Sequence, residues 1–168
     1  EIQETILGMT FDKEFAIEAQ NLLVERGVNV MTEVGITEIC GEDKVQSVKL
    51  NNGQELEADA VILSMGYKPN TGLAKEMGLP LNKFGFIEAD QYRRTEVKDV
   101  FAAGDCASKV DYSTGKLSRI MLASTACTEA RVAGLNLYDL CTFSSFRGTV
   151  GIYGTCVGET AIGVAGLI

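Results

Sequence analysis

Histidine is absent from the sequence, and its absence argues against several kinds of site. A Ser-His-Asp triad and a Cys-His nucleophile both use an imidazole as the base. The five cysteines form no C-x-x-C pair and show no ligand-like spacing: Cys40, Cys106, Cys127, Cys141 and Cys156. We therefore expect no metal site. Because an odd, scattered set of thiols is typical of reduced proteins, we also expect a cytoplasmic location.

Positive charge is scarce. Lysine and arginine number 15 against 23 aspartate and glutamate residues, which gives a formal net charge of −8. A nucleic-acid partner needs a basic surface that releases counterions, so we expect none. Apolar runs stay below the roughly 18 residues that indicate a membrane span, and no charged-then-apolar leader is visible, so we expect no membrane partner.

One glycine pattern is missing although glycine is plentiful, with 18 residues. No G-x-G-x-x-G sequence occurs anywhere in the chain. A Rossmann unit binds the pyrophosphate of a dinucleotide through that glycine turn and the helix that follows it. The sequence therefore contains no complete pyrophosphate-binding unit of this kind.

The patterns that are present predict an α/β fold. Apolar residues recur at helical spacing over 11–26, with Asp12 as the N-cap and Gly27 just past the end. We expect a short strand over 28–31. Alternating segments and the Asn52-Gly53 turn then predict a β-meander between residues 34 and 63.

The remaining expected elements follow the same local signals. They are a short helix over 71–77 ended by Gly78, an extended segment over 79–92, a polar connection over 108–119, a helix over 124–140, and strands over 149–153 and 160–164. The helix over 124–140 has a mostly small apolar face: Ala126, Ala130, Ala133, Leu137 and Leu140. Its candidate caps are Ser124, Thr125 and Thr128.

One functional pattern ends at Asp105. The run Val100-Phe101-Ala102-Ala103 predicts a strand buried on both faces, and Gly104 lets another group approach the backbone closely. Asp105 then places a carboxylate at the carboxyl end of the strand, where open α/β sheets bind ligands. A carboxylate there accepts hydrogen bonds from sugar or sugar-alcohol hydroxyls. The residues alone fit equally well a buried strand whose aspartate caps the next turn.

A second pattern lies at residues 60–70. Ala60-Val61-Ile62-Leu63-Ser64-Met65 is an apolar strand candidate, and Pro69 must end it because proline donates no backbone hydrogen bond. Gly66 has no side chain, so a planar ring could approach its backbone. On its own, this segment also fits an ordinary strand-ending turn.

Together the two patterns resemble the pyridine nucleotide-disulfide oxidoreductase family. The spacing from Thr95 through Val100-Phe101-Ala102 to Gly104-Asp105 is similar to the family's second FAD-binding motif. Residues 60–70 are similar to the strand and G-x-x-P-N turn that lead from the NAD domain back to the FAD domain. The resemblance covers nearly the whole chain and points to the branch of NADH oxidase, NADH peroxidase and coenzyme A-disulfide reductase.

The resemblance implies cofactor-binding positions but no catalytic residue in this chain. Asp105 would hold the ribityl chain of FAD, within the motif that Thr95 and Gly104 help to define. Gly66 and Met121 would border the nicotinamide of NAD(P)H.

The start of the helix after residue 121 is also implied to face the flavin. Leu122 and Ala123 would touch it, with Ser124 in the first turn. A helix N-terminus offers free N–H groups and a partial positive charge, which suit an electron-rich edge. The residues alone also fit a capped amphipathic helix with no ligand.

The resemblance further implies how the chain is divided: 1–66 as the second half of an NAD(P)-binding domain, 67–142 as the carboxyl-side part of a Rossmann-like, three-layer FAD-binding domain, and 143–168 as the first strands of an α+β dimerisation domain. The family's two glycine turns and its redox cysteine would lie upstream. None of the five cysteines matches that redox cysteine, and we expect Cys106 to be a small buried residue.

The expected parent is a flavoprotein that passes a hydride from NAD(P)H to FAD and then electrons to oxygen, peroxide or a disulfide. The chain alone is expected to be inactive. Its half-domains would leave apolar edges uncovered, so we expect a homo-oligomer such as a dimer. The alternative is a non-catalytic interaction or assembly module, which the missing glycine turns favour.

Overall fold

The computed structural model describes residues 1–140 and 144–166, and its backbone forms two compact units. The first unit contains residues 1–65 and 152–166, and the second contains residues 66–151. The expected boundary at 142/143 and Cys141 involve residues outside the described ones, so the division into three parts stays a prediction. No helix in the described part of the chain is long and apolar enough to cross a membrane.

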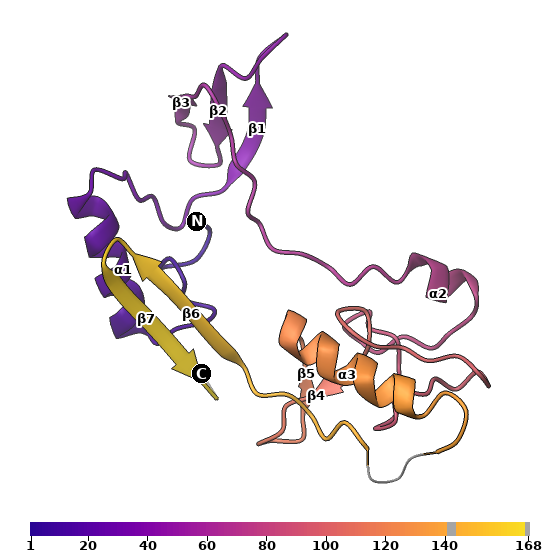
Figure 1. Ribbon diagram of the computed structural model, residues 1–168. Helices are drawn as coiled ribbons and strands as arrows, with labels where there is room; N and C mark the ends of the chain where they lie inside the picture. Colours follow the sequence, from indigo (N-terminus) through magenta and orange to yellow (C-terminus); the bar gives the residue numbers. More distant parts are fainter. Residues whose placement is uncertain (141–143, 167–168) are drawn as a thin grey trace. The chain divides into compact units, whose positions relative to one another are not determined.

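The first unit contains the predicted helix, α1 (Lys13–Glu25), and a hairpin of β6 (Ile152–Val157) and β7 (Thr160–Ala165). Asp12 is the N-cap residue, although its side chain makes no capping hydrogen bond. Gly27 has a φ of 85°, the left-handed conformation that suits glycine after a helix. The helix packs against the hairpin (Figure 1) through a core of Phe11, Ala19, Val157 and Ile162.

The first unit also contains the predicted meander, in the order β1 (Ile36–Cys40), β2 (Ser47–Leu50) and β3 (Glu55–Glu57). Gly53 has a φ of 86° in the turn between β2 and β3, as expected for a glycine hairpin position. The strand predicted over 28–31 is wrong, because that segment pairs with no strand among the described residues. The strand predicted over 149–153 begins only at Ile152, and Thr149 pairs with Asp111 instead.

The second unit is built around α2 (Gly72–Glu76) and α3 (Ala123–Leu135), both drawn in Figure 1. Gly78 has a φ of 76° and ends the short helix as predicted. The core beside α2 consists of buried small and aliphatic side chains: Ala74, Leu79, Ile87, Ala102 and Ala107. The polar connection over 108–119 contains a hairpin that was not predicted, formed by β4 (Lys109–Val110) and β5 (Leu117–Ser118).

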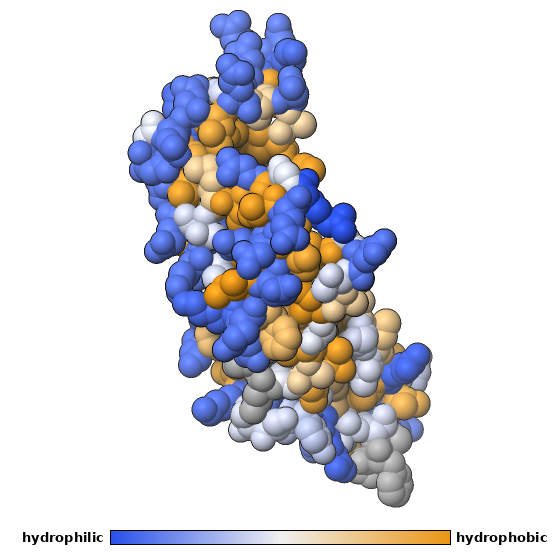
Figure 2. Space-filling model, turned by 90° about the vertical axis from the view of Figure 1, so that its left-hand side faces the viewer, coloured by the Kyte–Doolittle hydropathy of each residue, from blue (hydrophilic) through white to orange (hydrophobic). Residues whose placement is uncertain are grey.

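Two predicted strands do not form. Residues 60–65 pair with no strand in the described part of the chain, and Ile62 and Met65 are 91% and 80% exposed. Phe101 makes only an isolated bridge with Arg94. A strand needs neighbouring backbone groups to complete its hydrogen bonds, which apolar sequence alone does not supply. Figure 2 shows apolar side chains on the surface of the molecule, next to polar ones.

The buried face of α3 also differs from the prediction. Ala130, Leu137 and Leu140 are exposed, and the helix ends at Leu135. Of the predicted face, Ala133 is buried, and the other buried residues of the helix are Thr125, Glu129 and Val132. Polar side chains occupy this face because each has hydrogen-bond partners inside the unit.

Candidate functional site

A tight turn presents Asp105 to solvent. Gly104 has a φ of 84°, a conformation that L-residues with side chains rarely adopt. The Ala107 N–H donates to the Gly104 carbonyl at 3.0 Å and closes the turn. The Asp105 side chain is exposed and accepts no hydrogen bond from any other described residue. Its carboxylate is therefore available to accept hydrogen bonds from a ligand.

Buried charges hold this turn from behind. The Gly104 N–H donates to Glu129 Oε2 at 2.6 Å, and Lys109 Nζ donates to the Gly104 carbonyl at 3.0 Å. Arg93 Nη1 donates to Glu129 Oε1 at 3.1 Å, and Lys109 Nζ lies 3.7 Å from the same oxygen. Side chains of Arg93, Lys109 and Glu129 are 2%, 1% and 0% exposed. The backbone on both sides of Gly104 is thus fixed by groups that water does not reach.

The electrostatics of this cluster follow from its burial. Burial raises the pKa of Glu129 and lowers the pKa values of Arg93 and Lys109, because each charged form loses hydration. The opposite charges act against these shifts: Arg93 and Lys109 favour the Glu129 carboxylate, and Glu129 favours both cations. Asp105 also favours the charged form of Lys109. The two cations and two carboxylates therefore balance one another.

The first turn of α3 lies against Gly104. A β-carbon placed on Gly104 would be 3.6 Å from that of Ala126. Leu122 is the N-cap, and no side chain caps the helix. The first helical hydrogen bond runs from the Ala126 N–H to the Leu122 carbonyl, so the N–H groups at 123–125 precede the helical ladder. The start of α3 thus offers N–H donors beside the Asp105 turn.

The predicted caps of α3 are wrong: the N-cap is Leu122, no side chain caps the helix, and the hydroxyls of Thr125 and Thr128 bond elsewhere. Thr125 Oγ1 and Thr149 Oγ1 are 2.8 Å apart and buried. Thr128 Oγ1 donates to the Ser124 carbonyl at 3.1 Å. Ala123 and Ser124 are exposed, and Leu122 is half-buried. The helix therefore begins without the side-chain cap that usually blocks its donors.

The turn after Gly66 reaches the segment that precedes α3. Gly66 is exposed with a φ of 77°, and a β-carbon there would meet nothing within 4 Å. The Tyr67 hydroxyl donates to the Met121 carbonyl at 3.5 Å. Tyr67 and Met121 share the lining of a hollow of about 290 Å³ with Arg119 and Phe84. The hydrogen bond thus joins Tyr67, the neighbour of Gly66, to Met121, and the resemblance assigns both Gly66 and Met121 to the nicotinamide.

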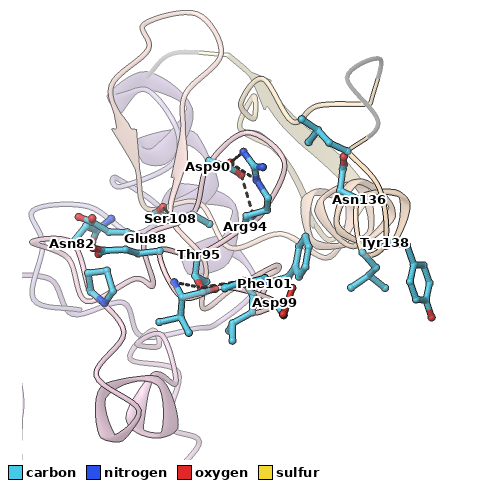
Figure 3. Close-up of a pocket in the computed structure, with 18 of the residues that line it drawn as sticks. Asn82, Glu88, Asp90, Arg94, Thr95, Asp99, Phe101, Ser108, Asn136 and Tyr138 are labelled. Atoms are coloured by element: carbon cyan, nitrogen blue, oxygen red, sulfur yellow. Dashed lines mark hydrogen bonds and ion pairs between the residues drawn. The ribbon is translucent and has the colours of Figure 1, made fainter.

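Thr95 lies apart from the other predicted positions. Its hydroxyl bonds with the Val97 and Val100 carbonyls at 3.2 and 3.0 Å, within its own loop. It lines a separate hollow of about 790 Å³, shown in Figure 3, in which none of the other predicted positions takes part. In the same view Asp90 and Arg94 point toward one another. Thr95 shapes the loop that leads to Asp105.

The sequence patterns missed Arg93, Lys109 and Glu129. Glu129 lies one helical turn after Thr125, on the same face of α3. It could have been predicted to be buried only if that face had first been recognised as the buried one. Cys106 is half-buried rather than buried, with Sγ 3.5 Å from the Ala103 carbonyl. The turn that places Asp105 outward also leaves its neighbour part-exposed.

Comparisons with known proteins agree with these features. The family model described as pyridine nucleotide-disulphide oxidoreductase matches residues 1–130. An NADH oxidase from Enterococcus faecalis is 32% identical over 164 residues, which cover 95% of this chain and 36% of the oxidase. The chain spans about a third of the length of such curated relatives.

Two solved structures are similar over most of the chain. An NAD-dependent persulfide reductase from A. fulgidus has a TM-score of 0.88 and 31% identity, over 96% of this chain and 29% of the reductase. An FAD-dependent pyridine nucleotide-disulphide oxidoreductase from Desulfovibrio vulgaris has a TM-score of 0.82 and 35% identity, over 93% and 39%. The predicted α/β, Rossmann-like fold class is confirmed by these matches.

Proposed function

This chain belongs to the pyridine nucleotide-disulphide oxidoreductase family, and we propose that it contributes part of the FAD and nicotinamide site of a flavoprotein oxidoreductase. The reaction proposed is hydride transfer from NAD(P)H to FAD, followed by electron transfer to oxygen, peroxide or a disulfide. FAD, when bound, supplies the redox chemistry, and the residues of this chain bind and orient it.

One observation carries the proposal: a free carboxylate and a free helix N-terminus lie side by side. Asp105 follows Gly104, whose N–H bonds to Glu129 of α3, and a β-carbon on Gly104 would lie 3.6 Å from that of Ala126 in the first turn of α3. A carboxylate binds the hydroxyls of a sugar-alcohol chain, while free backbone N–H groups bind an electron-rich edge. FAD carries both groups, so the residues present fit this cofactor. In this arrangement Asp105 anchors the ribityl chain, and the N–H groups of Ala123 and Ser124 face the ring.

The nicotinamide side is assigned to Gly66 and Met121. Gly66 lacks a side chain and has open space where a β-carbon would lie, so a flat ring can approach its backbone. The hydrogen bond from Tyr67 to Met121 keeps this turn beside the start of α3. Thr95 contributes by holding the loop that precedes Asp105.

Assembly and location are proposed on separate grounds. Ile62, Met65 and Tyr67 are exposed apolar side chains in a segment without a strand partner among the described residues. A second copy of the protein would cover such surface, so we assign it to a homo-oligomer, of which a dimer is the simplest. The free thiols of Cys40, Cys106, Cys127 and Cys156 fit the reducing cytoplasm.

The test is the affinity for FAD. Titrating the full-length protein with FAD, followed by flavin fluorescence, should give saturable binding and a yellow protein. Asp105→Ala should weaken binding by about tenfold or more, because a hydrogen bond to a charged group is lost. Glu96→Ala is the matched control, since it removes an exposed carboxylate that lines the separate hollow.

Two outcomes would contradict the proposal. Unchanged FAD affinity in Asp105→Ala would remove Asp105 from the site. A wild-type protein that stays colourless with excess FAD would instead support a non-catalytic assembly module.

A further inference from the structure

Glu129 and Lys109 bond to the two backbone groups of one residue, Gly104. The Gly104 N–H donates to Glu129 Oε2 at 2.6 Å, and the Gly104 carbonyl accepts from Lys109 Nζ at 3.0 Å. Lys109 Nζ also donates to the Ala107 carbonyl at 2.9 Å, at the far end of the same turn. These bonds fix the peptide planes on both sides of Gly104, and hence the direction in which Asp105 leaves the turn.

We infer that Glu129, with Lys109, is a positioning residue for FAD: it orients the Gly104–Asp105 turn so that the Asp105 carboxylate meets the cofactor. This inference rests on the proposed function. Glu129 is fully buried, and its carboxylate oxygens bond to Gly104 and Arg93 inside the unit. Its effect on FAD is therefore exerted through Asp105.

Stability alone does not account for these charges. Burying a charged group costs hydration, and replacing buried charges by well-packed apolar residues of similar volume often leaves a protein equally or more stable. An apolar residue at position 129 would still pack in the unit, yet it would leave the Gly104 N–H without its acceptor. A hydrogen-bond acceptor at position 129 is therefore needed by the turn rather than by the core.

The charge balance supports the same role. Arg93 lies 3.1 Å from the Glu129 carboxylate and acts against burial, which raises the pKa of Glu129. Both carboxylates, Glu129 and Asp105, favour the charged form of Lys109. A neutral residue at 129 would leave Lys109 with Asp105 as its remaining acidic neighbour. The Asp105 carboxylate would then be drawn toward Lys109 and away from a ligand.

A double-mutant cycle tests this inference in the full-length protein, from which FAD is removed before the titration. The variants are Glu129→Gln, Asp105→Ala and the combination, each titrated with FAD and unfolded in urea. In the wild-type background Glu129→Gln should weaken FAD binding by about tenfold, because the amide can still accept from the Gly104 N–H but no longer carries the charge beside Arg93 and Lys109. In the Asp105→Ala background it should weaken binding by less than about twofold, because the group that it positions is gone. Urea stability should fall in both backgrounds.

Other results would overturn the inference. Unchanged FAD affinity in Glu129→Gln would do so, as would an equal loss of affinity in both backgrounds, which indicates a general structural effect. If Glu129→Gln does not fold, Lys109→Met replaces it in the cycle, since it removes the side-chain bond to the Gly104 carbonyl and keeps the Arg93–Glu129 pair. A different result would contradict the proposed function itself: an Asp105→Ala variant that binds FAD as tightly as the wild type.

Discussion

The Arg93 guanidinium lies 3.1 Å from the Glu129 carboxylate, and both side chains are almost wholly buried. Arg93 has a φ of 68°, a left-handed conformation that is uncommon for a residue with a long side chain. It also donates to the Ser108 carbonyl at 2.8 Å, so one side chain connects the loop before Asp105, the segment after it, and α3. The candidate site is therefore supported by residues that do not line it.

Removing Arg93 should be strongly destabilising. Arg93→Met leaves the Glu129 charge buried with only Lys109 beside it, which should lower the free energy of unfolding by about 3–5 kcal/mol. Arg94→Met is the matched control, because Arg94 pairs with Asp90 on the exposed side of the same loop. That change should cost about 0.2–1 kcal/mol. Urea unfolding followed by circular dichroism measures both. Equal losses in the two variants would show that burial of the pair contributes nothing.

Local signals predicted the elements that depend on neighbours in sequence. The helix before Gly27 and the short helix before Gly78 both end at glycines with positive φ, and Gly53 closes the hairpin where it was expected. In each case a glycine without a β-carbon permits the turn, so the sequence contains the cause. At Gly104 the sequence predicted only that another group could approach the backbone, and the positive φ of 84° at this position was not predicted.

Long-range contacts explain what the sequence did not predict. Ile62 lies in an apolar run typical of a buried strand, yet it is 91% exposed. A strand there would need a neighbouring strand to pair with, and the apolar run does not specify one. Glu129 was absent from the expected face of α3 because a charged side chain is buried only when partners such as Arg93 meet it. The spacing of apolar residues holds no information on such partners. The supporting residues of a site are thus harder to predict than its exposed ones.

Two glycines in the second unit should respond oppositely to alanine. Gly104→Ala should lower the free energy of unfolding by about 1–2 kcal/mol, because an L-residue is strained at a φ of 84°. The new methyl group would be only in ordinary contact with Ala126, so strain rather than a clash is the cause. Gly134→Ala lies within α3 in open space and should raise stability by up to about 1 kcal/mol. Thermal unfolding of the pair checks both signs. A stabilising Gly104→Ala would contradict the turn geometry.

Asp90 should make the free energy of unfolding fall as the pH is lowered through the acid range. Burial alone would raise its pKa, but hydrogen bonds from Arg94 and from the Arg94 and Tyr92 N–H groups outweigh burial, and its pKa lies below the usual 3.8. A carboxyl group with a lower pKa in the folded state stabilises above its unfolded pKa, and that contribution is lost as the pH falls through the folded pKa. Asp90→Asn should therefore flatten the decrease in stability below about pH 4 by a few tenths of a kcal/mol, since the pair is part-exposed. Urea unfolding at a series of pH values measures this slope, and an unchanged slope would contradict the assignment.

The buried hydroxyl pair of Thr125 and Thr149 gives the last prediction. Their Oγ1 atoms are 2.8 Å apart, and this contact joins α3 to the segment that pairs with Val110. Thr149→Val leaves the Thr125 hydroxyl buried without that partner and should cost about 1–3 kcal/mol, as should Thr125→Val. The double variant replaces both hydroxyls by methyl groups of similar shape, so it should be more stable than either single variant. Urea unfolding of the four proteins gives the coupling energy. Additive losses would mean that each hydroxyl has another partner, and the contact would then have no part in holding the start of α3 beside the Asp105 turn.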